Sequence, residues 1–151
     1  MKKFLIAIVL IGLALAASPA TASATITPLH PDVQYALDEV PGGVALSATH
    51  AVWPALGMTV TAESPFARSV GTCATGTYCA YAGTALTGTK LTFAICTNVS
   101  TAGLRSVGSI ANGRSSGKVQ ARDSAGTVLG TAFPNGSATV GSGTVGLLCT
   151  L

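Results

Sequence analysis

The chain has 151 residues, of which 48% are hydrophobic and 9% are charged, and its formal net charge is +3. Without an N-terminal targeting segment, about 127 residues remain, which is the size of one ordinary domain with its own core. No fixed repeat is present, which excludes a solenoid, and the small net charge gives little basis for nucleic-acid binding.

Residues 1–24 have the parts of a signal peptide. Lys2 and Lys3 precede the apolar run Phe4–Ala17, and Ala22-Ser23-Ala24 provides a small-residue cleavage site. The apolar run is too short for a comfortable membrane span. We expect the mature chain to begin at Thr25, to be secreted, and to have no membrane attachment after signal cleavage.

Residues 25–66 predict a short helix followed by a β-ribbon. Pro31 suits the first turn of a helix, and the apolar residues that follow at helical spacing are Val33, Ala36, Leu37 and Val40. Strands are predicted over Val44–Ala48 and Met58–Ala62, with His50–Gly57 connecting them. This unit is too small to bury a core alone, so we expect it to pack on the rest of the chain. A pro-segment that is later cut away is the alternative.

Residues 67–151 predict a disulfide-stabilised β domain. Short β-prone runs alternate with turns rich in Gly, Ser and Thr, such as 83–89, 123–126 and 134–136. The predicted strands are Tyr78–Ala82, Lys90–Ile95, Ser106–Ala111, Lys118–Asp123, Val128–Ala132, Ala138–Val140 and Val145–Cys149. Alternation places Leu91, Phe93 and Ile95 on one face, and Val119 and Ala121 inward. Many short strands at regular spacing indicate a small Greek-key sandwich or barrel.

The mature chain contains four cysteines, at positions 73, 79, 96 and 149. An even number of cysteines in an exported chain indicates disulfides, and four of them allow three pairings. We favour Cys73–Cys79, which closes a small loop, and Cys96–Cys149, which ties the last strand to the middle of the sheet.

The charges are segregated along the mature chain. Residues 25–66 contain four acids and no Lys or Arg, whereas residues 67–151 contain six Lys or Arg and the single acid Asp123. Such a division indicates mutual docking, an acidic segment that masks a basic surface, or chance placement.

The sequence offers no catalytic residues, no metal ligands and no cofactor motif, so we do not expect an enzyme. The only histidines, His30 and His50, lie in turn-like settings without a neighbouring partner. No Ser occupies a nucleophile-elbow motif. Tyr78 and Tyr81 are more typical of core packing than of a stacking platform for bases or sugars.

The region around Cys73 resembles a known family. The pattern Cys73…Gly76-Thr77-Tyr78-Cys79-Ala80-Tyr81, then Leu86-Thr87-Gly88, Leu91-Thr92-Phe93 and Cys96, with Ser109 and Asn112 at a strand end, resembles peptidase inhibitor family I36. The resemblance implies a small secreted bacterial protein with a βγ-crystallin-like Greek-key fold. The residues that bind calcium in crystallin-type domains are missing, so no metal is expected.

Two loops are candidates for contact with a partner. Thr75, Gly76 and Thr77 lie in the loop that the Cys73–Cys79 bond would clamp, and the second loop presents Asn112, Gly113, Arg114 and Ser115 between two strands. A loop held rigid before binding loses little entropy on docking, and Arg114 would enter a peptidase pocket. The alternative is that both loops are ordinary connections between strands.

These observations lead to two functional hypotheses. The first is a monomeric, secreted peptidase-inhibitor-like protein that blocks an extracellular peptidase by loop docking. The second is a non-inhibitory exported binding or structural module whose basic domain adheres to anionic cell-envelope polymers.

Overall fold

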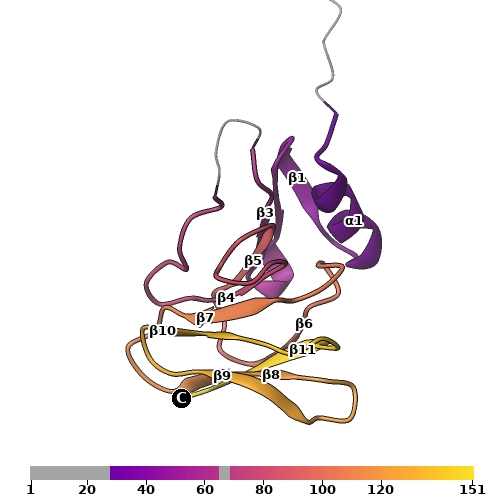
Figure 1. Ribbon diagram of the computed structural model, residues 1–151. Coiled ribbons are helices and arrows are strands. Elements are labelled where there is room, and N and C mark those ends of the chain that lie inside the picture. The colour runs from indigo at the N-terminus through magenta and orange to yellow at the C-terminus, as the bar shows by residue number, and fades with distance from the viewer. Residues whose placement is uncertain (1–27, 65–68) are drawn as a thin grey trace, which may run out of the picture.

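The structure is a computed structural model that describes residues 28–64 and 69–151. The described chain is mostly β, with one short N-terminal helix and two antiparallel sheets of seven and four strands (Figure 1). The expected fold class is confirmed at this level. The predicted signal peptide lies outside the described residues, and no described helix has the length and apolarity that crossing a membrane requires.

The helix α1 spans Pro31–Glu39, as the sequence predicted. The His30 ring nitrogen Nδ1 accepts a hydrogen bond from the Asp32 backbone N–H at 3.2 Å and so caps the first turn. Val33 and Ala36 are fully buried, and they fix the face that the helix turns toward the sheet.

The seven-stranded sheet has the order β1-β2-β3-β5-β4-β7-β10. Its strands are β1 (Val44–Ser47), β2 (His50–Trp53), β3 (Met58–Thr61), β4 (Tyr78–Tyr81), β5 (Lys90–Phe93), β7 (Ser109–Asn112) and β10 (Gly136–Thr139). The N-terminal segment packs on the rest of the chain, as predicted, and it also shares this sheet, because β3 pairs with β5 from Met58↔Phe93 to Thr61↔Lys90.

The prediction that His50–Gly57 is a connection is wrong, because β2 occupies its first half. Ala51 and Trp53 are buried while His50 and Val52 are partly exposed, so this run alternates as a half-buried strand does. The Trp53 indole N–H donates to the Val40 carbonyl at 2.7 Å, and a Cβ on Gly43 would collide with the indole ring. The indole therefore ties the end of α1 to the sheet.

The four-stranded sheet has the order β6-β11-β8-β9. Its strands are β6 (Asn98–Ser100), β8 (Lys118–Arg122), β9 (Val128–Ala132) and β11 (Gly146–Thr150). Strand β6 was not predicted. It has only three residues, of which Val99 alone is partly buried, so its alternation of polar and apolar residues is too short to recognise. The inward placement of Val119 and Ala121 is confirmed, since both are fully buried.

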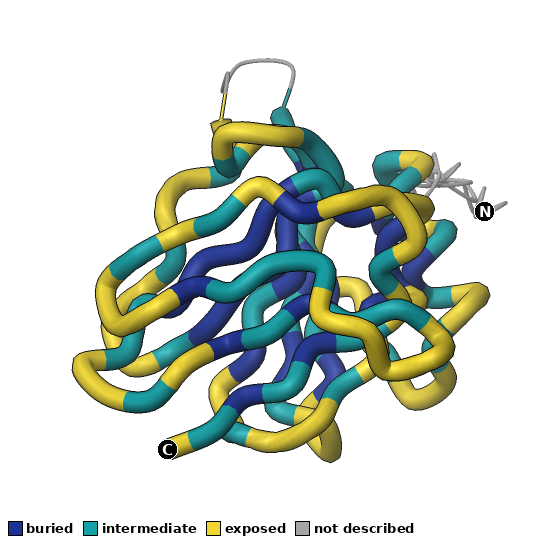
Figure 2. The backbone as a smooth tube through the Cα atoms, turned by 60° about the horizontal axis from the view of Figure 1, so that its bottom comes forward, coloured by how far each residue is buried: buried dark blue, intermediate teal, exposed yellow. Residues whose placement is uncertain are grey.

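The core lies between the two sheets and under α1 (Figure 2). Tyr78, Leu91, Phe93, Ile110 and Leu147 are among its largest fully buried side chains, and the Tyr78 and Phe93 rings stack with centroids 5.2 Å apart. The prediction that Ile95 continues the face of Leu91 and Phe93 is wrong. Strand β5 ends at Phe93, so the alternation stops there and the Ile95 side chain is 53% exposed.

Both disulfides have the pairing favoured from the sequence. Cys73–Cys79 attaches the segment before β4 to that strand. Cys96–Cys149 joins the connection between β5 and β6 to β11. No described cysteine is free.

The turn between β8 and β9 makes stability sensitive to acid. The Asp123 carboxylate accepts the backbone N–H groups of Thr127 at 2.8 Å and Ala125 at 2.9 Å, and the hydrogen bond from Thr127 is the main cause that lowers the pKa of this exposed carboxyl. A depressed pKa in the folded state means that the stabilisation is complete above the unfolded-state pKa and is lost as the pH falls through the folded-state value.

We expect Asp123→Asn to flatten the decline of stability on the acid side, because the amide keeps an acceptor oxygen but does not titrate. Urea midpoints measured at about pH 6 and about pH 2.5 span the range in which a carboxylate titrates, and they test this expectation. Equal shifts of the midpoint in the variant and the wild type would contradict it.

Candidate functional site

The two loops predicted from the sequence lie side by side at one end of the molecule. The Gly76 N–H donates to the Gly113 carbonyl, and the Gly113 N–H donates to the Thr77 carbonyl, both at 2.9 Å. Close approach requires a glycine at position 113, since a Cβ there would lie inside contact distance of the Ala74 carbonyl. The disulfide loop and the loop after β7 are therefore one surface.

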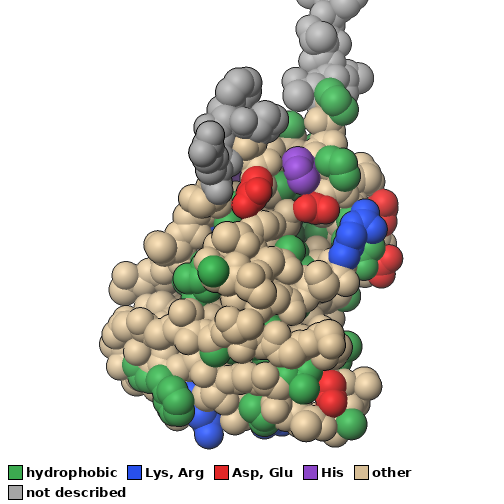
Figure 3. Space-filling view, viewed as in Figure 1, with side chains coloured by type: hydrophobic (Ala, Val, Ile, Leu, Met, Phe, Trp, Pro, Cys, Tyr) green, Lys and Arg blue, Asp and Glu red, His purple; other side chains and the backbone are tan. Residues whose placement is uncertain are grey.

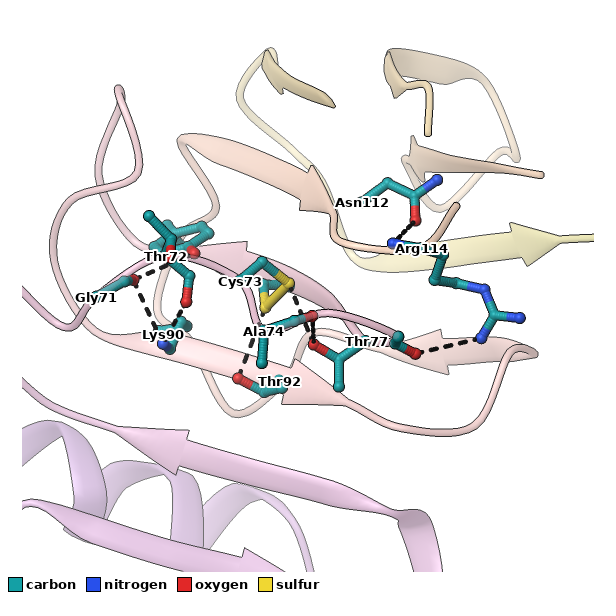
Figure 4. Close-up of a disulfide and its surroundings, with 12 residues drawn as sticks. Gly71, Thr72, Cys73, Ala74, Thr77, Lys90, Thr92, Asn112 and Arg114 are labelled. Carbon is teal, nitrogen blue, oxygen red and sulfur yellow. Dashed lines mark hydrogen bonds between the residues drawn. A yellow bond between two sulfur atoms is a disulfide. The ribbon is translucent and has the colours of Figure 1, made fainter. Parts of the chain in front are cut away.

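Arg114 braces these loops instead of projecting freely from them. One guanidinium nitrogen, Nη1, donates to the Gly76 carbonyl at 3.5 Å, and the Arg114 backbone N–H donates to Asn112 Oδ1 at 3.1 Å (Figure 4). The side chain is partly buried, and its Nε is buried without a hydrogen-bond partner in the described structure. Arg114 would have to leave these contacts to enter a peptidase pocket.

A third loop, residues 133–136 between β9 and β10, joins this surface. The Asn135 N–H donates to the Arg114 carbonyl at 3.0 Å, and the adjacent Phe133 is 66% exposed. The sequence showed this segment as a turn, Pro134-Asn135-Gly136, and the Gly136 N–H closes it on the Phe133 carbonyl at 2.9 Å. Its place beside Arg114 follows from the pairing of β10 with β7, which no local pattern indicates.

The segment that leads into the disulfide loop is fixed at several points. Lys90 Nζ donates to the carbonyls of Val70, Gly71 and Thr72 at 2.8, 3.3 and 3.1 Å, and burial lowers the pKa of this ammonium. The Tyr81 hydroxyl donates to the Gly71 carbonyl at 3.4 Å, and burial raises the pKa of Tyr81 to about 12. Within the loop, the Thr77 hydroxyl donates to the Ala74 carbonyl at 2.7 Å. Within the disulfide loop the exposed residues are 74–76, and Gly71 and Thr72 in the segment before it are exposed as well.

The interior behind this surface is polar at one point. Asn112 is 1% exposed, and because it pairs with Tyr78 its side chain lies on the core face of β7. The Tyr78 hydroxyl contacts the Ile95 carbonyl at 2.9 Å and the Thr97 carbonyl at 3.3 Å. Burial raises the pKa of Tyr78, opposed in part by the backbone of Thr97 and by the charge of Arg114. Asn112 Oδ1 therefore supports the loop from inside, whereas its Nδ2 is buried without a hydrogen-bond partner in the described structure, and the residue also lines the pocket described below.

A pocket of about 250 Å³ opens between the disulfide loop, β7 and β10. Its walls include Cys73, Leu86 and Ala111, and its rim includes Thr72, Thr75 and Ser137. The Leu86 N–H donates to Ser109 Oγ at 3.0 Å, and that hydroxyl donates to the Gly83 carbonyl at 2.7 Å. Ser109, part of the pattern that carried the family resemblance, thus holds the wall of the pocket in place.

The two histidines lie apart and make separate contacts in the described structure. His50 lies in β2, not in a turn as predicted, with its Nδ1 3.2 Å from the Thr61 hydroxyl, and His30 caps α1. In residues 28–64 and 69–151 no group of three or more His, Cys, Asp or Glu side chains is placed to hold a metal ion.

Comparison with known proteins finds no relative of this chain. No family model matches the chain, and neither a curated protein nor a solved structure is significantly similar to it. The resemblance to the inhibitor family therefore depends on the residues of this chain alone.

Proposed function

We propose that the protein is a secreted inhibitor that blocks an extracellular peptidase by docking the tip of its disulfide loop, residues 74–76. The observation that carries the proposal is the bracing of this exposed tip. The Cys73–Cys79 bond clamps the base of the loop, and the main chain of Gly113 holds the other side. Such a loop is ordered before it binds, so docking loses little conformational entropy.

The finer fold assignment supports the same proposal. We infer a βγ-crystallin-like Greek-key arrangement, because consecutive strands β4 and β5 pair with each other while β4 also pairs with β7, and β10 returns to β7 across the intervening β8 and β9. Together with the pattern from Cys73 to Cys96, this order fits the inhibitor family that the sequence resembles. Two disulfides fit an oxidising, extracellular environment. Monomeric action is part of the proposal.

Adhesion to anionic cell-envelope polymers has less support, because some of the basic side chains are engaged in contacts within the molecule. Lys90 binds three main-chain carbonyls, and Arg105 lies over the Tyr35 ring at 4.2 Å with its Nε 3.8 Å from Asp32. On the face shown in Figure 3, acidic side chains gather near α1 and few charged side chains cover the strands. That face offers no basic patch for a polyanion.

We expect the purified mature protein to inhibit at least one member of a panel of serine and metallo-peptidases at micromolar concentration. Ala74→Trp places a large side chain on the exposed tip and is expected to weaken inhibition by about tenfold or more, since a clash at the docking point removes close packing. The measurement is the inhibition constant against the responding peptidase.

The matched control is Ala125→Trp, at an exposed position in the turn at the opposite end of β8. This position lies outside the surface formed by the three loops, so the same substitution there should leave inhibition unchanged. No inhibition across the panel, or equal weakening by the two variants, would remove the proposal.

A further inference from the structure

The pocket beside the disulfide loop combines a cavity with strained backbone. Three non-glycine residues in the described chain have positive φ, namely Ala85 (53°), Leu86 (62°) and Asn135 (55°). Leu86 and Asn135 both line the pocket, and Ala85 precedes Leu86 directly. A left-handed conformation is unfavourable for Ala and for Leu, and such residues concentrate at binding sites, where the surrounding structure holds them.

The chemistry of the pocket selects an uncharged ligand. Leu86, Ala111 and the Cys73 side of the disulfide offer apolar surface, whereas Thr72, Thr75 and Ser137 offer hydroxyl groups at the rim. No charged side chain is among the described residues that line it, so a buried ligand charge would have no partner. Aromatic side chains, on which rings commonly stack, are also missing from this lining.

We propose that this pocket is a binding site for a short uncharged peptide segment that carries a small aliphatic side chain. The aliphatic group contacts Leu86 and Ala111, and the flanking amides exchange hydrogen bonds with the hydroxyl groups of the rim. The volume of about 250 Å³ is below that of pockets for drug-sized molecules and suits one residue.

The site also deepens the proposed function. Thr75 belongs both to the exposed tip of the disulfide loop and to the rim of the pocket, so a peptidase docked on the tip would bring its own surface residues to the pocket. That role rests on the proposed inhibition. The binding itself does not, and it is measurable without any peptidase.

The test is a titration of the isotope-labelled mature protein with N-acetyl-leucinamide, followed through the backbone amide signals of Thr75, Leu86 and Gly113. We expect saturable shifts in the millimolar range, as for a ligand of this size. N-acetyl-lysinamide is expected to bind about tenfold more weakly, because its charge is desolvated without a partner.

A pair of variants on β10 locates the binding. Ser137→Trp covers the mouth of the pocket and should abolish the shifts. Thr139→Trp, on the same face of the same strand and equally exposed but outside the pocket, should preserve them. Both positions are exposed, so neither substitution disturbs the core.

Three results would overturn the site: shifts confined to the apolar groove at Leu56, Ile95 and Val99, shifts that persist in Ser137→Trp, or tighter binding of N-acetylglucosamine than of N-acetyl-leucinamide. Saturable pocket shifts in a protein that inhibits no peptidase would support the site and remove only the inhibitory function. Inhibition without pocket shifts would support the inhibitory function and remove the proposed site.

Discussion

A chain that begins at residue 69 is expected not to fold. Strand β3 covers the edge of β5, and its Met58 and Val60 are buried against Leu91 and Phe93 across the pair. Removal of residues before 69 also takes away the buried side chains of Val33 and Trp53. At about 1.5–3 kcal/mol for each large buried side chain, the loss is comparable to the whole stability of a domain, about 5–15 kcal/mol.

The measurement is urea unfolding of residues 69–151, followed by circular dichroism, beside the mature chain from residue 25 as control. The mature chain should show one cooperative transition and the truncated chain none, because β5 would present an uncovered edge and an apolar face. A cooperative transition of the truncated chain would instead favour the alternative that residues 25–66 are a pro-segment.

Loss of the Cys96–Cys149 disulfide is expected to have the second-largest effect. Cys96 and Cys149 are 53 residues apart in sequence, whereas Cys73 and Cys79 are 6 apart. By the entropy of loop closure, the longer link stabilises by about 4 kcal/mol and the shorter by about 2 kcal/mol. Cys96→Ser with Cys149→Ser should therefore destabilise the protein about twice as much as Cys73→Ser with Cys79→Ser.

Urea midpoints of the two double variants, measured in the same buffer, compare these effects directly. The variant pair at Cys73 and Cys79 is the internal control, because it also removes two sulfur atoms and one disulfide. Equal losses would show that chain entropy does not govern the difference. Inhibition should follow the reverse order, since only the shorter link clamps the docking tip.

The elements that the sequence predicted are those whose signals are local. Pro31 and the spacing from Val33 to Val40 were enough for α1, and the alternation in Lys118–Arg122 was enough for β8. Strand β6 was missed because it has only three residues. In β2 the order of polar and apolar residues was hidden by the following Pro54 and Gly57, which favoured a loop.

The candidate site was predicted in its parts but not in its assembly. Both loops were recognisable from glycine and cysteine spacing, whereas their contact depends on the pairing of β4 with β7, residues far apart in the chain. The contact of Arg114 with the Gly76 carbonyl was missed for the same reason, since a lone Arg in a loop gives no sign of the carbonyl beside it. Leu86 gave no sign of its left-handed backbone, because aliphatic residues rarely adopt it.

The links among the three loops are largely main-chain to main-chain. The Gly76, Gly113 and Asn135 N–H groups all donate to carbonyls, so the side chains at Ala74 and Thr75 take no part in these links. Residues 74 and 75 can therefore be substituted, by natural drift or in a display library, without loss of these main-chain hydrogen bonds. Under the proposed function, a change of target would require substitutions only at the tip, while the main-chain hydrogen bonds among the three loops would remain.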